Sequence, residues 1–189
     1  MKLIKSYLQE MVDILQRMPV EEIDKAVSIL NEVRENGKTI YLVGNGGSGA
    51  TASHFANDIV KNTIQEGRPR VKCVALTDNM PIIMAIANDM DYSLIFIEQL
   101  RPLAQPGDVL IGFSGSGNSP NVIKAMEWAK ENGMATIALG GRDGGKIKLM
   151  ADVSIIAPTD SMAQLEDVHL MVTHMLFLSM MGDTRPALM

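Results

Sequence analysis

The sequence has one cysteine, few aromatic residues and no long apolar run. Cys73 has no partner for an intramolecular disulfide, which suits a reducing cytoplasm. It lies in the strand-like stretch Val71–Leu76, which favours a packing role over a catalytic thiol. The longest mostly apolar segment, residues 170–181, is interrupted by polar residues and is too short to span a bilayer. The first residues lack the pattern of a signal peptide. We therefore expect a cytoplasmic protein with no membrane partner.

An excess of positive charge is also missing. The formal net charge is −5 and the pI is about 5.2, which argues against nucleic acid or an anionic surface as a partner. An anionic substrate must then be held by local groups. With 189 residues and 47% hydrophobic content, the chain fits a single domain over residues 1–189 with a sizeable core.

The P-loop motif is absent, but two loops rich in glycine and serine are present. They are Gly44-Asn45-Gly46-Gly47-Ser48 and Ser114-Gly115-Ser116-Gly117-Asn118-Ser119. Neither has the Gly-Lys-Ser/Thr of a P-loop, so ATP is disfavoured. A single such loop is usually only a turn that closes a βα unit. Because both follow a β-branched run and open a helix, where backbone N–H groups converge on an anion, the pair predicts a phosphate pocket.

Hydrophobic periodicity predicts a helical hairpin in residues 1–37 and an α/β sandwich in residues 38–189. The hairpin helices are expected at residues 2–17 and 20–36. The expected strands are 39–43, 71–76, 109–113, 135–139 and 153–156. The expected helices are 49–64, 80–87, 92–103, 120–132, 145–150 and 161–181. Five buried strands joined by helices indicate a parallel sheet, which binds ligands at the carboxyl ends of its strands, where both loops lie.

Histidines and carboxylates form a second group of candidate residues. His54 and Asp58 are four residues apart and share a helix face, as in a two-residue metal site or a simple helix salt bridge. The last predicted helix adds Glu166 and His174, about 12 Å apart along its axis at 1.5 Å per residue. His169 faces another direction and is interpreted as a surface or supporting residue.

Taken together in this order, the motifs resemble the phosphoheptose isomerases, a family of sugar isomerase (SIS) domain proteins. The resemblance rests on both loops, on His54 with its acid four residues later, and on His174. It also includes Asn88-Asp89, the stretch Asn121–Ala125 and Asp143-Gly144-Gly145. It implies a flavodoxin-like three-layer αβα sandwich with a five-stranded parallel sheet. It further implies a homotetramer with sites at subunit interfaces, and interconversion of sedoheptulose 7-phosphate with D-glycero-D-manno-heptose 7-phosphate.

The resemblance also assigns roles to residues of this chain. Asp58 and His174 correspond to the catalytic acid and histidine. The family resemblance also implies a zinc ion, held at the positions that correspond to His54, Asp58, Glu166 and His174. The substrate residues implied are Asn45, Gly46, Gly47, Ser48, Asp89, Ser114, Gly115, Ser116, Asn118 and Ser119. Asp89 has a second interpretation as the cap of a helix beginning near Tyr92.

Two of the four implied ligands differ from the family pattern. The family usually has Glu where Asp58 stands and Gln where Glu166 stands. Two carboxylates and two neutral imidazoles neutralise a divalent ion better than a set with an amide, which favours retention of a metal. Asp is shorter than Glu, however, and a shift of about 1 Å in a reacting group can cost roughly a hundredfold in rate.

Three alternatives remain open at this point. The first is a non-catalytic SIS module that binds a sugar phosphate or another protein, since fold alone does not fix function. The second is an SIS isomerase of a pentose or hexose phosphate. The third, a metal-dependent hydrolase or aldolase, is disfavoured because no lysine lies in a Schiff-base motif. The polar set His54, Asp58 and His174 distinguishes an enzyme from a sensor.

Overall fold

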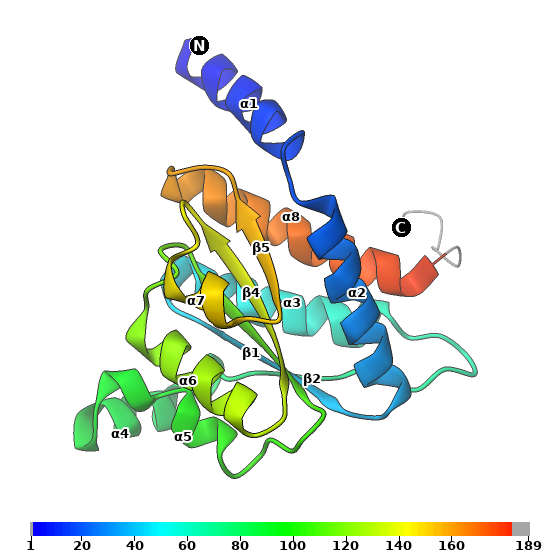
Figure 1. Ribbon diagram of the computed structural model, residues 1–189, viewed down its shortest axis with the longest axis vertical. Coiled ribbons are helices and arrows are strands. Elements are labelled where there is room, and N and C mark those ends of the chain that lie inside the picture. The colour runs from blue at the N-terminus through cyan, green and yellow to red at the C-terminus, as the bar shows by residue number, and fades with distance from the viewer. Residues whose placement is uncertain (1, 183–189) are drawn as a thin grey trace.

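A computed structural model describes residues 2–182 as an αβα sandwich with one projecting helix (Figure 1). In chain order the elements are α1 (Lys2–Leu15), α2 (Val20–Glu35), β1 (Thr39–Gly44), α3 (Gly46–Asn62), β2 (Lys72–Ala75), α4 (Met80–Asp89), the 3-10 helix η1 (Tyr92–Leu94), α5 (Ile97–Leu100), β3 (Val109–Ser114), α6 (Pro120–Glu131), β4 (Ala135–Gly141), α7 (Gly145–Met150), β5 (Val153–Ala157) and α8 (Met162–Met181). The predicted fold class is confirmed.

The sheet is parallel throughout, with strand order β2-β1-β3-β4-β5. Alternate residues of β1 enter two separate cores, because successive side chains of a strand point to opposite faces. Ile40 and Leu42 pack with α2, α3 and α8, whereas Tyr41 and Val43 pack with α4 to α7. Ser114 of β3 is paired with Gly140 of β4, so the segments that follow these two strands emerge side by side.

Two segments differ from the sequence-based boundaries. The first glycine loop does not precede its helix but forms the first turn of α3, which begins at Gly46. The helix expected over residues 92–103 is divided into η1 and α5. The Asp91 side chain accepts a hydrogen bond from Ser93 N at 2.7 Å, which starts a 3-10 turn.

The two N-terminal helices occur where expected, but they do not form the predicted hairpin. Helix α1 does not fold back along α2 and instead projects beyond the sandwich (Figure 1). Leu3, Ile4 and Leu8 of α1 are exposed. Polar contacts tie the helix to the start of α8, including a 2.6 Å hydrogen bond from Gln164 to Glu10. Part of the apolar side of α1 is thus exposed. Within residues 2–182, no helix combines the length and the apolar character that a membrane span requires.

Candidate active site

The first loop offers the backbone N–H groups of a helix N-terminus. Asn45 stands at the N-cap position of α3, yet its side chain makes no capping hydrogen bond. Gly46 and Gly47 follow in the first helical turn and are exposed, whereas Ser48 is buried. The unsatisfied N–H groups and the partial positive charge of this turn suit an anionic or hydroxyl-rich ligand.

The serine loop joins β3 to α6 and is closed by hydroxyl contacts. Ser114 Oγ and Ser119 Oγ are 3.1 Å apart, and Ser116 Oγ accepts a hydrogen bond from Asn118 N at 3.2 Å. Ser119 is the N-cap of α6 without a side-chain capping bond. Pro120 has no N–H and Val122 N donates to Asn121 Oδ1, so the donors that this helix start can offer a ligand are Asn121 N and the serine hydroxyls.

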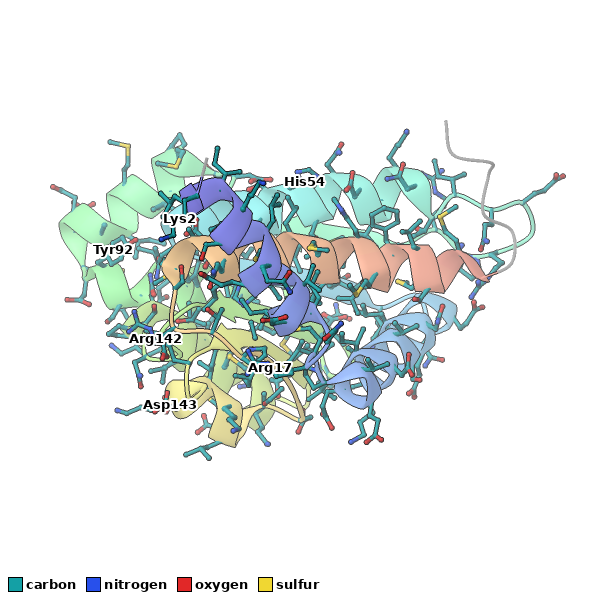
Figure 2. The ribbon with its side chains drawn as sticks, turned by 90° about the horizontal axis from the view of Figure 1, so that it is seen from above. Lys2, Arg17, His54, Tyr92, Arg142 and Asp143 are labelled. Carbon is teal, nitrogen blue, oxygen red and sulfur yellow. The ribbon has the colours of Figure 1, made fainter. Side chains whose placement is uncertain are left out.

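The turn after β4, residues 142–145, packs against the serine loop. Gly117 has a φ of 64°, and a Cβ there would lie 2.0 Å from the Gly144 carbonyl oxygen. Ile147 N donates to Gly117 O at 3.1 Å. A Cβ on Gly145 would lie 2.6 Å from the Ser116 carbonyl oxygen, so the close fit of the two loops explains a glycine at this position too. Figure 2 shows Arg142 and Asp143 of this turn at the end of the molecule where α8 begins. Asp143 Oδ1 accepts from Gly145 N, and Arg142 is exposed.

A cavity of about 460 Å³ opens beside the first loop. Asn45, Gly46 and Ser53 supply part of its lining, while α4 and η1 supply a largely apolar wall. Asp89 is exposed and accepts from Asn88 Nδ2 at 2.7 Å, and the cap of the next helical turn is Asp91. The capping interpretation of Asp89 is therefore wrong.

His54, Asp58 and His174 come together between α3 and α8. Asp58 Oδ2 lies 3.0 Å from His54 Nε2 and 3.5 Å from His174 Nε2, and the two Nε2 atoms are 3.5 Å apart. The Asp58 side chain is only 15% exposed, while both imidazoles remain accessible. Figure 2 shows His54 on α3, alongside α8. We call these three residues the His/Asp/His cluster.

The cluster has the donors of a divalent-metal site. Its ligand atoms all lie within 4.8 Å of one another, and two imidazoles with one carboxylate are a set that zinc accepts in catalytic sites. The residues present therefore fit the predicted ion. Glu166 is not brought to the cluster. A Cβ added to Gly47 would lie 2.2 Å from Glu166 Oε1, so this carboxylate lies against the first loop, nearer the start of α8.

His169 belongs to the core and not to the cluster. It is 1% exposed, its Nε2 lies 3.1 Å from Gly140 O, and its ring packs edge-on to Phe113. Burial lowers the pKa of His169 to about 4. The surface interpretation is thus excluded: His169 is a neutral core residue that links α8 to β4.

Acidification is expected to destabilise the protein through His169. The pKa of this group falls from 6.5 in the unfolded chain to about 4 in the fold, so stability is lost as pH drops below 6.5 and the loss is complete near pH 4. The full effect is roughly 3 kcal/mol. Urea unfolding at pH 7 and pH 4.5 of wild type and His169→Asn measures it. An equal loss of stability in both proteins would contradict this assignment.

The arrangement of a parallel sheet with two glycine and serine loops at its carboxyl edge defines an SIS domain, and the SIS domain family matches residues 6–141. Phosphoheptose isomerase from Trichlorobacter lovleyi is 40% identical over 176 residues, which cover 92% of this chain and 89% of the relative. The chain belongs to the phosphoheptose isomerase family of SIS-domain proteins.

Solved structures agree with this family. The phosphoheptose isomerase from Neisseria gonorrhoeae has a TM-score of 0.88 at 34% identity, covering 95% of this chain and 97% of that one. The one from Francisella tularensis has a TM-score of 0.87 at 29% identity, covering 97% and 96%. Because the family is one of sugar-phosphate isomerases, the prediction of an enzyme of this class is confirmed.

Proposed function

We propose that this enzyme interconverts sedoheptulose 7-phosphate and D-glycero-D-manno-heptose 7-phosphate through an enediolate. The observation that carries the proposal is the His/Asp/His cluster, 3.0 to 3.5 Å between its polar atoms, in a chain that also has two anion-binding loops. A protein that only bound a sugar phosphate would have no use for that cluster. The names of the relatives support the heptose phosphate as substrate.

The reaction needs a base at the carbon beside the carbonyl and a group that stabilises the resulting oxygen anion. We assign these tasks to Asp58 and His174, the catalytic pair expected from the sequence. A zinc ion held by His54, Asp58 and His174 would supply Lewis-acid polarisation of the carbonyl. Glu166 lies at the first loop, and we place it at the substrate and not at the ion.

The serine loop is the proposed phosphate site. Ser114, Ser116 and Ser119 hydroxyls and the N-terminus of α6 would hold the phosphate, with Gly115 and Asn118 shaping the loop. The first loop, with Asn45, Gly46, Gly47 and Ser48, would receive the sugar together with Asp89. Binding energy at the phosphate would thereby orient the reacting carbons.

We infer a cytoplasmic homotetramer whose sites lie at subunit interfaces. The exposed apolar residues of α1, and Met80 and Met84 of α4 beside the cavity, support such contacts. Burial of these surfaces is favourable by about 25 cal/mol per Å².

Thermal shifts with a panel of sugar phosphates test the substrate. We expect sedoheptulose 7-phosphate to stabilise the enzyme more than ribulose 5-phosphate or fructose 6-phosphate at equal concentration, because tighter ligands stabilise more by mass action. Sedoheptulose without phosphate is the matched control and should have little effect. A larger shift with a pentose or hexose phosphate would transfer the assignment to that sugar.

A further inference from the structure

An amide pair joins the first loop to the helix that follows the serine loop. Asn45 Nδ2 donates to Asn121 Oδ1 at 2.9 Å, and Asn121 Nδ2 donates back to Asn45 Oδ1 at 2.8 Å. Asn121 is 1% exposed. Tyr92 enters from a third segment and donates its hydroxyl to Asn45 Oδ1 at 3.0 Å. These three side chains, the amide hub, connect the segments that carry the proposed substrate residues.

The direction of every bond in the amide hub follows from one backbone group. Val122 N can only donate, and it lies 3.0 Å from Asn121 Oδ1. That contact fixes which atom of the Asn121 amide is the oxygen. Because this oxygen faces the Asn45 side chain, the atom of Asn45 that lies against it must be the nitrogen. The oxygen of each amide then accepts two hydrogen bonds, which fills its lone pairs.

This count determines what Asn45 can still do. One N–H of its amide remains after the bond to Asn121, and Asn45 lines the cavity beside the first loop. Asn45 can thus act toward a sugar as a donor, to a carbonyl or hydroxyl oxygen. The partner that holds this N–H in place is buried and lies at the start of α6, next to the proposed phosphate site.

We propose that Asn121 is a positioning residue: through Asn45 it fixes the first loop relative to the serine loop, and so sets the distance between the phosphate and the reacting end of the sugar. Tyr92 acts on the same Asn45 oxygen from the open side, where its side chain remains exposed (Figure 2). This inference rests on the proposed function for its substrate. The coupling between the two loops depends only on the hydrogen bonds of the amide hub.

Asn121→Asp is the sharpest variant because it keeps the shape of the side chain. It retains an oxygen for Val122 N and Asn45 Nδ2, but sets a second oxygen against Asn45 Oδ1. Displacement of a substrate contact by about 1 Å costs roughly a hundredfold in rate. We therefore expect kcat/KM for the sugar phosphate to fall by about that factor. Binding of inorganic phosphate should weaken by a smaller factor, because the added charge lies next to the proposed phosphate site. Asn132→Asp, at the other end of α6, is the matched control.

Tyr92→Phe removes one hydrogen bond from the amide hub and keeps the aromatic ring. Its expected loss in kcat/KM is smaller, about three- to tenfold. Since both residues act through one Asn45 oxygen, Tyr92→Phe should cost less in the Asn121→Asp background than in wild type. Tyr41→Phe, which removes a hydroxyl bond to Leu103 O elsewhere, is the control. If Tyr92→Phe reduced kcat/KM by the same factor in both backgrounds, the inference that the two residues act through one Asn45 oxygen would be wrong.

Calorimetric titrations with inorganic phosphate and with the sugar phosphate separate the possible outcomes. If wild type turns over no sugar phosphate, the proposed function fails, and the inference is judged on binding alone. It then predicts that Asn121→Asp weakens sugar-phosphate binding at least about tenfold more than phosphate binding. Equal losses for both ligands, or a lower melting temperature with unchanged kinetics, would show a purely structural role and overturn the inference.

Discussion

His174→Ala is expected to reduce turnover of the sugar phosphate by roughly a thousandfold or more. General acid–base groups contribute about 10² to 10⁴ in rate, and this imidazole also completes the His/Asp/His cluster. The side chain is 41% exposed, so its removal leaves the core between α3 and α8 intact. Steady-state kinetics of the purified variant measures the loss.

Binding of the sugar phosphate should survive this substitution, because the serine loop is unchanged. Met175→Ala, the neighbouring and similarly exposed position on α8, is the matched control and should retain normal activity. A fully active His174→Ala enzyme would remove His174 from the mechanism.

Asp58→Asn is expected to abolish zinc binding and with it most activity. Asp58 is the one carboxylate in the His/Asp/His cluster, and its oxygen faces both imidazoles, so the amide leaves a divalent ion without charge compensation. We expect zinc affinity and kcat each to fall at least about a hundredfold. Calorimetric titration of zinc into protein prepared without chelator or affinity tag measures the affinity directly.

Asp58→Glu provides the complementary variant, since it restores the side chain usual in the family and should still bind zinc. Asp24→Asn, an exposed carboxylate on α2, controls for the change in net charge. Unaltered zinc affinity in Asp58→Asn, or absence of zinc binding by wild type, would contradict the metal site.

Features that depend on local sequence were predictable. The strands, both loops and the His54–Asp58 pair follow from periodicity and spacing within short segments. His174 was placed with them by the family resemblance, and the contact between α3 and α8 confirms its position beside His54. The separation of Glu166 from His174 follows from the helical rise. The family resemblance, in contrast, placed both residues at one ion.

Features that depend on contacts between distant segments were not predictable. The pairing of Asn45 with Asn121 joins residues 76 positions apart, and no pattern in either segment indicates it. The direction of α1 is likewise decided by its polar contacts with α8, such as Gln164 with Glu10. His169 has the same residue type as His174, and its burial and its contacts with Gly140 and Phe113, which no local pattern indicates, make it a core residue.

A proton NMR time course of the purified protein with sedoheptulose 7-phosphate, with and without added zinc, tests the proposed isomerase most directly. We predict that the aldoheptose phosphate appears with wild type and not with His174→Ala, and that added zinc does not slow its formation. Such a result would show that Asp58 suffices where the family usually has Glu. No conversion by wild type, together with thermal stabilisation by the same sugar phosphate, would contradict the proposed reaction and indicate a sugar-phosphate binding protein or an isomerase of another sugar.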